Sequence, residues 1–137
     1  MMTHGSKYLT GSLVVVGLLV ALVNGASAVD RYGVIGLSND TDVALNFQYR
    51  EGDGAWRPGR IQAGEKLWFA HRYDRPNGHH SPLFHIRFDS DLRSGRFDIE
   101  YTLQHRAAVG QGYDYGAKYA FRYDRGDRRF VDLKRID

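Results

Sequence analysis

Residues 43–50 read Val-Ala-Leu-Asn-Phe-Gln-Tyr-Arg, and this stretch decides the fold class of the chain. Large apolar residues take every second position, namely Val43, Leu45, Phe47 and Tyr49. Successive side chains of a β-strand point to opposite faces, so this alternation predicts a strand with one buried face and one solvent-exposed face.

The same alternation recurs along the chain. It marks strands near residues 67–73, 84–88, 97–103, 119–123 and 130–136, with shorter ones near 32–37 and 56–61. Glycine-containing turns separate them, as at Gly52-Asp53-Gly54 and Arg125-Gly126-Asp127, and no segment sustains a period of 3.6 residues. The pattern predicts an all-β domain, a single antiparallel sandwich or small barrel of about seven or eight strands. Its predicted core contains Phe47, Phe69, Phe84, Phe88, Phe97, Tyr101, Tyr119 and Phe121.

The first 28 residues have the composition of a secretory signal peptide. Lys7 precedes an uncharged apolar run, Leu13–Val23, and Ala26-Ser27-Ala28 follows it. A basic start, a short apolar middle and an Ala-x-Ala site are the three parts of such a peptide. The run is shorter than the roughly 20 residues that span a bilayer. We therefore predict cleavage after Ala28, a single all-β domain over residues 29–137, and a secreted or periplasmic protein without stable membrane insertion. An uncleaved membrane anchor is the alternative.

Composition excludes several kinds of chemistry. The chain has no cysteine, which rules out disulfides, thiolate metal sites and cysteine nucleophiles. Its 19 basic and 16 acidic side chains give a net charge of +3. Most of the basic residues are arginines interleaved with aspartates, whereas nucleic-acid binders gather their basic residues on one face or helix. We therefore expect no nucleic-acid role, and we expect the arginines to pair with aspartates of the same chain.

Several short segments resemble a family of small exported bacterial all-β proteins with no assigned function. The similar segments are Asn39-Asp40-Thr41, Phe47-Gln48-Tyr49-Arg50, Trp56, Ala63-Gly64-Glu65, Ser81-Pro82, Ile86–Leu92, Tyr101-Thr102-Leu103 and Tyr119-Ala120-Phe121. They lie between Leu37 and Ile136, and Ile86–Leu92 is the most specific of them. The resemblance implies an exported β module and implies no catalytic residues.

Four aromatic residues are candidate ligand-binding residues because they do not all fit the inward register: Trp56, Trp68, Tyr113 and Tyr115. Flat aromatic rings on a sheet face or loop are suited to sugars, polymers and protein partners. The alternative is that a further layer or a folded loop covers them.

A second candidate is a metal site built from His79, His80, His85 and Asp89. Imidazole and carboxylate groups suit zinc, copper or nickel. Their spacing matches no standard ligand motif, however, and a solvated loop beside a charged strand face explains it better. Asp89-Ser90-Asp91 also lacks the full calcium-loop pattern, and we favour a turn in which the carboxylates bond nearby backbone amides.

No catalytic motif is present. The serines in predicted turns are not in Gly-x-Ser-x-Gly, and neither a phosphate loop nor a dinucleotide fingerprint occurs. The sequence therefore predicts an exported, non-enzymatic β module without a cofactor, which binds a protein partner, an envelope component or an extracellular polymer. Two alternatives stay open: a glycan-binding module that uses the exposed aromatics, and a metal-dependent hydrolase on the His/Asp cluster.

Overall fold

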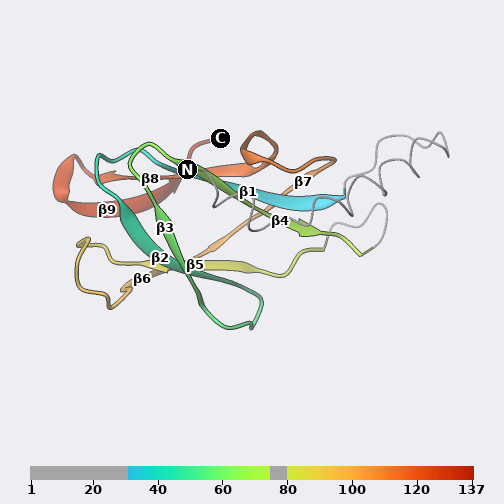
Figure 1. Cartoon of the computed structure of the whole chain (residues 1–137), viewed down its shortest axis with the longest axis horizontal. Helices are drawn as coiled ribbons and strands as arrows, with labels where there is room; N and C mark the ends of the chain where they lie inside the picture. The colour runs from blue at the N-terminus through green and yellow to red at the C-terminus, as the bar shows by residue number, and fades with distance from the viewer. Residues whose placement is uncertain (1–30, 75–79) are drawn as a thin grey trace.

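The computed structural model describes residues 31–74 and 80–137. The predicted leader and its cleavage site lie outside these residues, as does His79. The described part of the chain forms nine strands and one short 3-10 helix, and Figure 1 labels the strands. Their bounds are β1 Tyr32–Asn39, β2 Leu45–Glu51, β3 Arg57–Ile61, β4 Lys66–Arg72, β5 Phe84–Phe88, β6 Ile99–Leu103, β7 Arg106–Ala108, η1 Tyr113–Tyr115, β8 Ala117–Asp124 and β9 Asp127–Arg135.

The strands form two sheets that face each other, one in the upper and one in the lower part of Figure 1. The four-stranded sheet has the order β3-β2-β5-β6 and is antiparallel throughout. The five-stranded sheet has the order β4-β1-β8-β9, and β7 also pairs with β1. The all-β class is thus confirmed, and the described residues contain more strands than we predicted.

A wholly antiparallel arrangement was the wrong expectation for the five-stranded sheet. Strand β1 pairs with β8 in parallel, with Leu37 opposite Tyr119, while β7 pairs antiparallel with the beginning of β1. The chain turns back between β7 and β8, where η1 lies, so the two strands follow each other along one edge of β1 in opposite directions. Side-chain alternation is the same in parallel and antiparallel strands, so the sequence pattern could not separate them.

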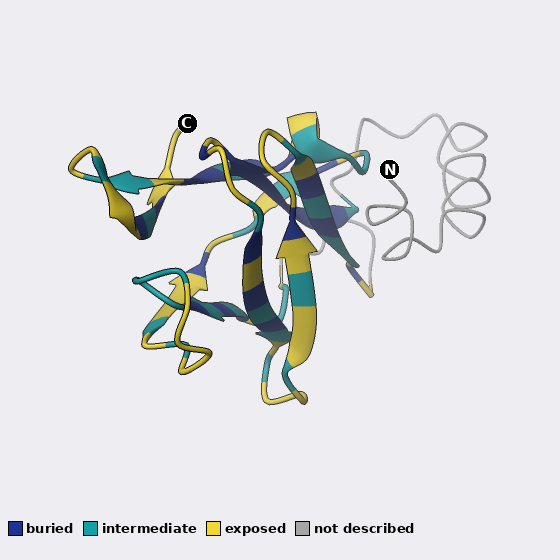
Figure 2. Ribbon diagram, turned by 60° about the vertical axis from the view of Figure 1, so that its left-hand side comes forward, coloured by how far each residue is buried: buried dark blue, intermediate teal, exposed yellow. Residues whose placement is uncertain are grey.

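One aromatic core joins the inner faces of both sheets. It contains Phe47, Phe84 and Phe88 of the four-stranded sheet and Phe69 and Phe121 of the five-stranded sheet, each at most 3% exposed. Burying one such side chain stabilises the fold by about 1.5–3 kcal/mol. The predicted strand register is therefore confirmed for the central strands, and Figure 2 shows the resulting bands of buried and less buried residues along β2.

Three residues that we expected to face the core do not lie in it. Val43 is exposed because β2 begins two residues later, at Leu45. Phe97 lies in the connection before β6, with a left-handed backbone (φ 52°), and is only partly buried. Tyr101 is exposed on β6, where its hydroxyl donates to Asp132 at 2.7 Å. Strand β6 begins at Ile99, so the predicted strand over 97–103 starts two residues late and Phe97 falls outside it.

The segment Asn39-Asp40-Thr41 forms the turn before β2 that its composition indicates. Asn39 is fully buried, and its Nδ2 donates to the carbonyl of Val43 at 2.7 Å and to that of Ile61 at 3.2 Å. Its Oδ1 accepts from the amide and the hydroxyl of Thr41. Every polar atom of this amide is therefore used inside the fold, which leaves it unsuited to glycosylation.

Candidate functional site

Trp56 lies on the outer face of the four-stranded sheet, immediately before β3. Two guanidinium groups lie over its ring, with the Cζ atom of Arg87 4.0 Å and that of Arg50 4.6 Å from the ring centroid. The residue is half-buried, so part of the aromatic surface still faces solvent. Cation–π contacts of this kind fix the ring without covering it fully.

Amide side chains orient the neighbouring arginines. Arg87 on β5 lies directly opposite Gln48 on β2, and its Nε donates to Gln48 Oε1 at 2.7 Å. Arg60 on β3 lies opposite Asn46, and its Nη1 donates to Asn46 Oδ1 at 2.8 Å. Each amide side chain orients a guanidinium through a hydrogen bond. Because the amide is neutral, it does not neutralise the positive charge of the guanidinium. We call the outward group the arginine face; it comprises Asn46, Gln48, Arg50, Trp56, Arg60 and Arg87.

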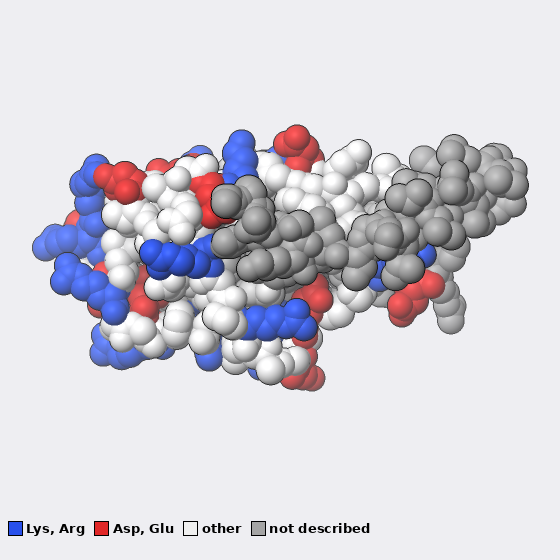
Figure 3. All heavy atoms as spheres, in the orientation of Figure 1, with Lys and Arg blue, Asp and Glu red and all other residues white. Residues whose placement is uncertain are grey.

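Ion pairs are distributed unevenly over the described residues. Every Lys or Arg that lies within 4.0 Å of a carboxylate comes from β7, β8 or β9, for example Arg122 with Asp40 and Arg129 with Asp127. In Figure 3 basic and acidic atoms adjoin each other at the left-hand end, where Figure 1 places the β8–β9 hairpin.

The arginine face lacks such pairs. Within the described chain none of its three arginines has a carboxylate at 4.0 Å or less, although Glu100 of β6 is the strand partner of Arg87. The expectation that the arginines pair with aspartates of the same chain is therefore correct for the β8–β9 side and wrong for this face. The sequence signal was available, because Asn46, Gln48 and Arg50 are the outward positions of the opening stretch.

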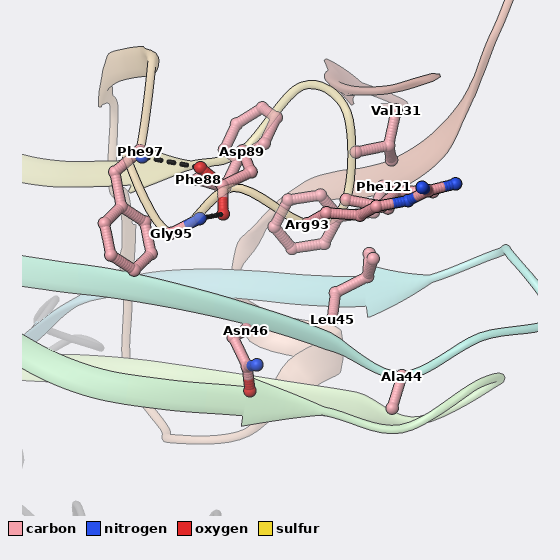
Figure 4. A pocket seen from close by; sticks show the side chains of 11 residues that line it. Ala44, Leu45, Asn46, Phe88, Asp89, Arg93, Gly95, Phe97, Phe121 and Val131 are labelled. Carbon is pink, nitrogen blue, oxygen red and sulfur yellow. Dashed lines mark hydrogen bonds between the residues drawn. The ribbon is translucent and has the colours of Figure 1, made fainter. Parts of the chain in front are cut away.

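A small pocket adjoins the arginine face at one end of the two sheets. Its volume is about 130 Å³. Leu45 and Phe88 line it from the four-stranded sheet, and Phe121 and Val131 line it from the five-stranded sheet. Figure 4 shows these side chains around the pocket, next to the segment 89–98 that connects β5 to β6. We call this space the loop pocket. Asn46 and Phe97 also line it, and the Arg87 guanidinium lies 5.8 Å from the Phe97 ring centroid, so the pocket and the face are continuous.

The connection over the loop pocket is held by the Asp89 carboxylate. Its two oxygens accept from the backbone amides of Gly95 at 2.7 Å and Phe97 at 2.6 Å, as the dashed lines in Figure 4 show. Asp91 accepts from the amides of Arg93 at 3.1 Å and Ser94 at 3.3 Å, and these two hydrogen bonds lower the pKa of the Asp91 carboxyl. The turn-bonding interpretation of these two aspartates is therefore confirmed.

The other aromatic candidates lie on the five-stranded sheet, away from Trp56. Trp68 of β4 is the strand partner of Gly36, and the Tyr113 ring covers the same glycine, with a ring carbon 2.9 Å from where a Cβ would stand. Only glycine allows this approach. Lys66 and Lys118 contact the Tyr113 ring at 5.0 and 5.6 Å. Tyr115 is 45% exposed in η1. The four predicted aromatics thus do not form one surface, although Trp68 and Tyr113 converge on Gly36.

The histidine candidates do not converge in the described residues. His80 is exposed just before β5, and His85 Nδ1 lies 3.0 Å from Thr102 Oγ1. Asp89 has both oxygens engaged by backbone amides. Among residues 31–74 and 80–137, no group of three or more His, Asp or Glu side chains is placed to hold a metal ion.

A polar cluster that the sequence did not indicate lies at the other end of the two sheets. His105, in the connection between β6 and β7, has a side chain only 8% exposed, and its Nε2 lies 4.0 Å from Glu51 Oε2. Burial, and secondarily His71, lowers the pKa of His105 to about 4. Burial raises the pKa of Glu51. These residues come from separate strands and connections, so no sequence motif could have revealed them.

Ser81 completes this cluster. Its Oγ and the His105 ring both pack against Gly33, where a Cβ would lie 2.2 Å from the hydroxyl. Both Ser81 Oγ and His105 Nε2 are buried without a hydrogen-bond partner among the described residues. They line an open pocket of about 430 Å³ together with Tyr73 and Leu103. Ser81 Oγ and His105 Nε2 are therefore not hydrogen-bonded to each other in this structure.

Comparison with known proteins adds no relative: no family model, no curated protein and no solved structure matches the chain. The resemblance to exported bacterial β proteins therefore stays a prediction from short motifs. Within the described residues, no helix has the length and apolar character needed to cross a bilayer.

Proposed function

We propose that residues 29–137 form an exported, non-enzymatic binding module, and that its arginine face binds an acidic polysaccharide of the cell envelope or of an extracellular matrix. The observation that carries this proposal is the set of arginines on the outer face of the sheet, Arg60 exposed and Arg50 and Arg87 partly buried, which are oriented by neutral amides and Trp56 and have no carboxylate within 4.0 Å in the described chain. A paired arginine would spend its charge within the fold, whereas the guanidiniums of this face have no carboxylate partner in the described chain and can pair with a ligand anion.

The chemistry of the face suits a carboxylated sugar polymer. A guanidinium pairs with a carboxylate through two parallel hydrogen bonds, and preorganisation by Gln48 or Asn46 lowers the entropy lost on binding. The part of the Trp56 ring that the two guanidiniums leave exposed offers an apolar surface to the C–H groups of a pyranose. Amide and hydroxyl groups nearby, such as Asn46 and Thr102, can bond the sugar hydroxyls.

The His105 cluster supports a non-enzymatic reading. Ser81 Oγ and His105 Nε2 are not bonded to each other, and a pKa of about 4 makes His105 a weak base at neutral pH. The metal-dependent alternative has less support, since Asp89 is committed to its loop and His85 to Thr102.

Affinity electrophoresis through gels that contain polygalacturonate tests the proposal. The purified protein should be retarded in this gel and not in a gel of uncharged β-glucan. Arg87→Gln and Trp56→Ala should each weaken binding by about tenfold, because each removes a contact that the polymer would make directly. The matched control is Arg129→Gln, which removes the same charge from a paired arginine on β9. It should change binding by less than about twofold.

Two results would refute the proposal. If Arg129→Gln weakened retardation as much as Arg87→Gln, binding would follow net charge rather than this face. If the protein bound a single-stranded oligonucleotide more tightly than polygalacturonate at the same ionic strength, the ligand class would be nucleic acid instead. Both measurements use circular dichroism to establish that each variant keeps its fold.

A further inference from the structure

We infer that the outer face of the five-stranded sheet is a second anion-binding face, and that the module cross-links two strands of the acidic polysaccharide, one on each sheet. This inference rests on the proposed function, because it assigns the second face the same ligand class as the arginine face. The second face comprises Lys66, Trp68, Tyr113, Lys118 and Lys134, and we call it the lysine face.

Every lysine of residues 29–137 lies on this face. The three are Lys66 on β4, Lys118 on β8 and Lys134 on β9. In each case a chain neighbour belongs to the core, so the alternation of the strand directs the lysine to the outer side. The outer face of the four-stranded sheet carries arginines and no lysine in the described chain. The two sheets thus present different cations in opposite directions, since their inner faces share one core.

Strand pairing brings lysines and aromatic rings together at the centre of the face. Lys118 and Trp68 are the strand partners of Gly36, one on each side of β1, and the Tyr113 ring covers this glycine. The Nζ atoms of Lys66 and Lys118 lie 5.0 and 5.6 Å from the centroid of the Tyr113 ring. An ammonium group from each strand beside β1 therefore contacts one tyrosine. Such cation–π contacts orient the ammonium groups and leave their positive charge in place.

Two of the three lysines have no acidic partner. In the described chain no carboxylate lies within 4.0 Å of the Nζ atom of Lys66 or Lys118. Lys134, in contrast, pairs with Asp132 at 3.5 Å. Lys118 donates to the backbone carbonyl of Asp114 at 3.2 Å, which is a neutral group. As on the arginine face, neutral contacts orient the cations without neutralising them, so the charge of the face is complementary to a polyanion.

The aromatic side chains favour a sugar polymer over a compact anion. Trp68 and Tyr113 are partly buried, and Tyr115 of η1 is 45% exposed. The exposed parts of these rings offer an apolar surface to the C–H groups of a sugar. An ammonium pairs with a carboxylate as a point charge, without the two-pronged geometry of a guanidinium. We therefore expect the lysine face to bind the polymer more weakly than the arginine face does.

The arrangement of the two faces leads to cross-linking. Packed sheets lie about 10 Å apart, and the outer side chains of both sheets add to this separation. A polymer segment on the arginine face therefore leaves the lysine face open to another strand. Within a polymer network the second contact follows the first as an intramolecular event, which raises the retention of the protein above that of either face alone.

Light scattering from dilute polygalacturonate measures the cross-linking. The purified protein is added in a buffer that contains a chelator, because divalent cations also bind carboxylates. Scattering should rise with protein and fall again at large protein excess, when each strand is saturated and bridges are lost. The double variant Lys66→Gln/Lys118→Gln should lower the scattering maximum by at least about fivefold. It should remain retarded in the polygalacturonate gel, because its arginine face is intact.

The matched control is Arg122→Gln/Arg129→Gln. It removes two positive charges from the same sheet, and both are paired, with Asp40 and Asp127 respectively. Its scattering should equal that of the wild type. Circular dichroism establishes that each variant keeps its fold, so a loss of scattering reports the face that was changed.

Four results would overturn the inference. It is wrong if the wild type is retarded in the gel without raising the scattering, and the proposed function then stands alone. It is wrong if the paired-arginine control loses as much scattering as the lysine variant, since net charge would then cause the effect. If sedimentation equilibrium shows a dimer that the lysine variant cannot form, a second copy of the chain occupies this face. If the lysine variant loses binding to phosphatidylglycerol vesicles and keeps full scattering, the partner is an anionic membrane. A wild type that is not retarded at all would refute the proposed function itself.

Discussion

Acidification from neutral pH to about pH 4.5 should lower the free energy of unfolding, and one buried side chain, His105, should account for most of the loss. His105 is held neutral in the fold because its side chain is 8% exposed and its Nε2 has no hydrogen-bond partner in the described chain. Its pKa of about 4 in the folded state compares with 6.5 in an unfolded chain. Between these values the unfolded state binds a proton that the folded state does not.

The size of the effect follows from this difference. At 1.36 kcal/mol for each pH unit, the separation between 6.5 and about 4 corresponds to about 3 kcal/mol at its limit. The stabilisation is fully present above pH 6.5 and is lost as the pH falls toward 4, with about 2.5 kcal/mol gone at pH 4.5. Glu51 acts in the opposite direction, because its raised pKa lets the folded state take up a proton first. Carboxyl groups whose pKa is lowered in the fold, such as Asp127 with a pKa of about 2, also stabilise the folded state, but most of that stabilisation is lost only below about pH 4.

Urea titrations followed by tryptophan fluorescence at pH 7, 6, 5 and 4.5 measure the effect. The matched variant is His105→Gln, whose amide cannot titrate; it should show a stability that changes little over this range. Glu51→Gln removes the opposing group and should make the pH dependence steeper than in the wild type. If His105→Gln and the wild type lost stability in parallel, His105 would not be held neutral by burial and the reasoning would be wrong. Comparing slopes rather than absolute stabilities cancels the cost of replacing the ring.

Three further predictions concern the core, the leader and the histidine loop. Phe88→Ala should lower the free energy of unfolding by about 3–5 kcal/mol, as expected for an emptied aromatic core position. Arg87→Ala, on the opposite face of β5, should lower it much less. Equal losses of stability for the two variants in denaturant titrations would contradict the strand register of β5. Mass spectrometry of the exported protein should find Val29 at the N-terminus, and a full-length membrane-retained product would contradict cleavage. Added zinc should leave the melting temperature of the wild type and of the His79→Ala/His80→Ala variant unchanged. If zinc raised the melting temperature of the wild type and not of the double variant, the hypothesis of a metal-dependent hydrolase would be supported instead.

Side-chain alternation predicted most of the fold because it reports which face of a strand is buried. Phe47, Phe84, Phe88 and Phe121 lie where the pattern placed them. It could not predict the parallel β1–β8 pair, since alternation carries no information about strand direction. It also failed at Phe97, where hydrogen bonds from backbone amides to Asp89 outweigh the tendency to extend the strand.

The candidate sites were less predictable, because each depends on residues that the fold brings together. Trp56 was identified as an outward aromatic, but its contact with Arg50 and Arg87 requires the pairing of β2 with β5. The His105 cluster draws Glu51 and Ser81 from distant segments. No local spacing encodes such a cluster, so only the arrangement of the strands could reveal it.

The arginines illustrate why composition alone misjudges a charged surface. Interleaved Arg and Asp residues predict internal pairing, and strand register decides where that pairing occurs. On β9 the sequence places Asp127 two residues from Arg129, so the charges neutralise each other at 2.9 Å. Across β2 and β5 the register instead sets Gln48 opposite Arg87, which orients the guanidinium without neutralising it. Holding an arginine side chain in one orientation costs conformational entropy, and without an ion pair no electrostatic attraction offsets that cost. That combination is disadvantageous for folding and advantageous for capturing an anion, and it is the physical reason why we propose that this sheet binds the ligand.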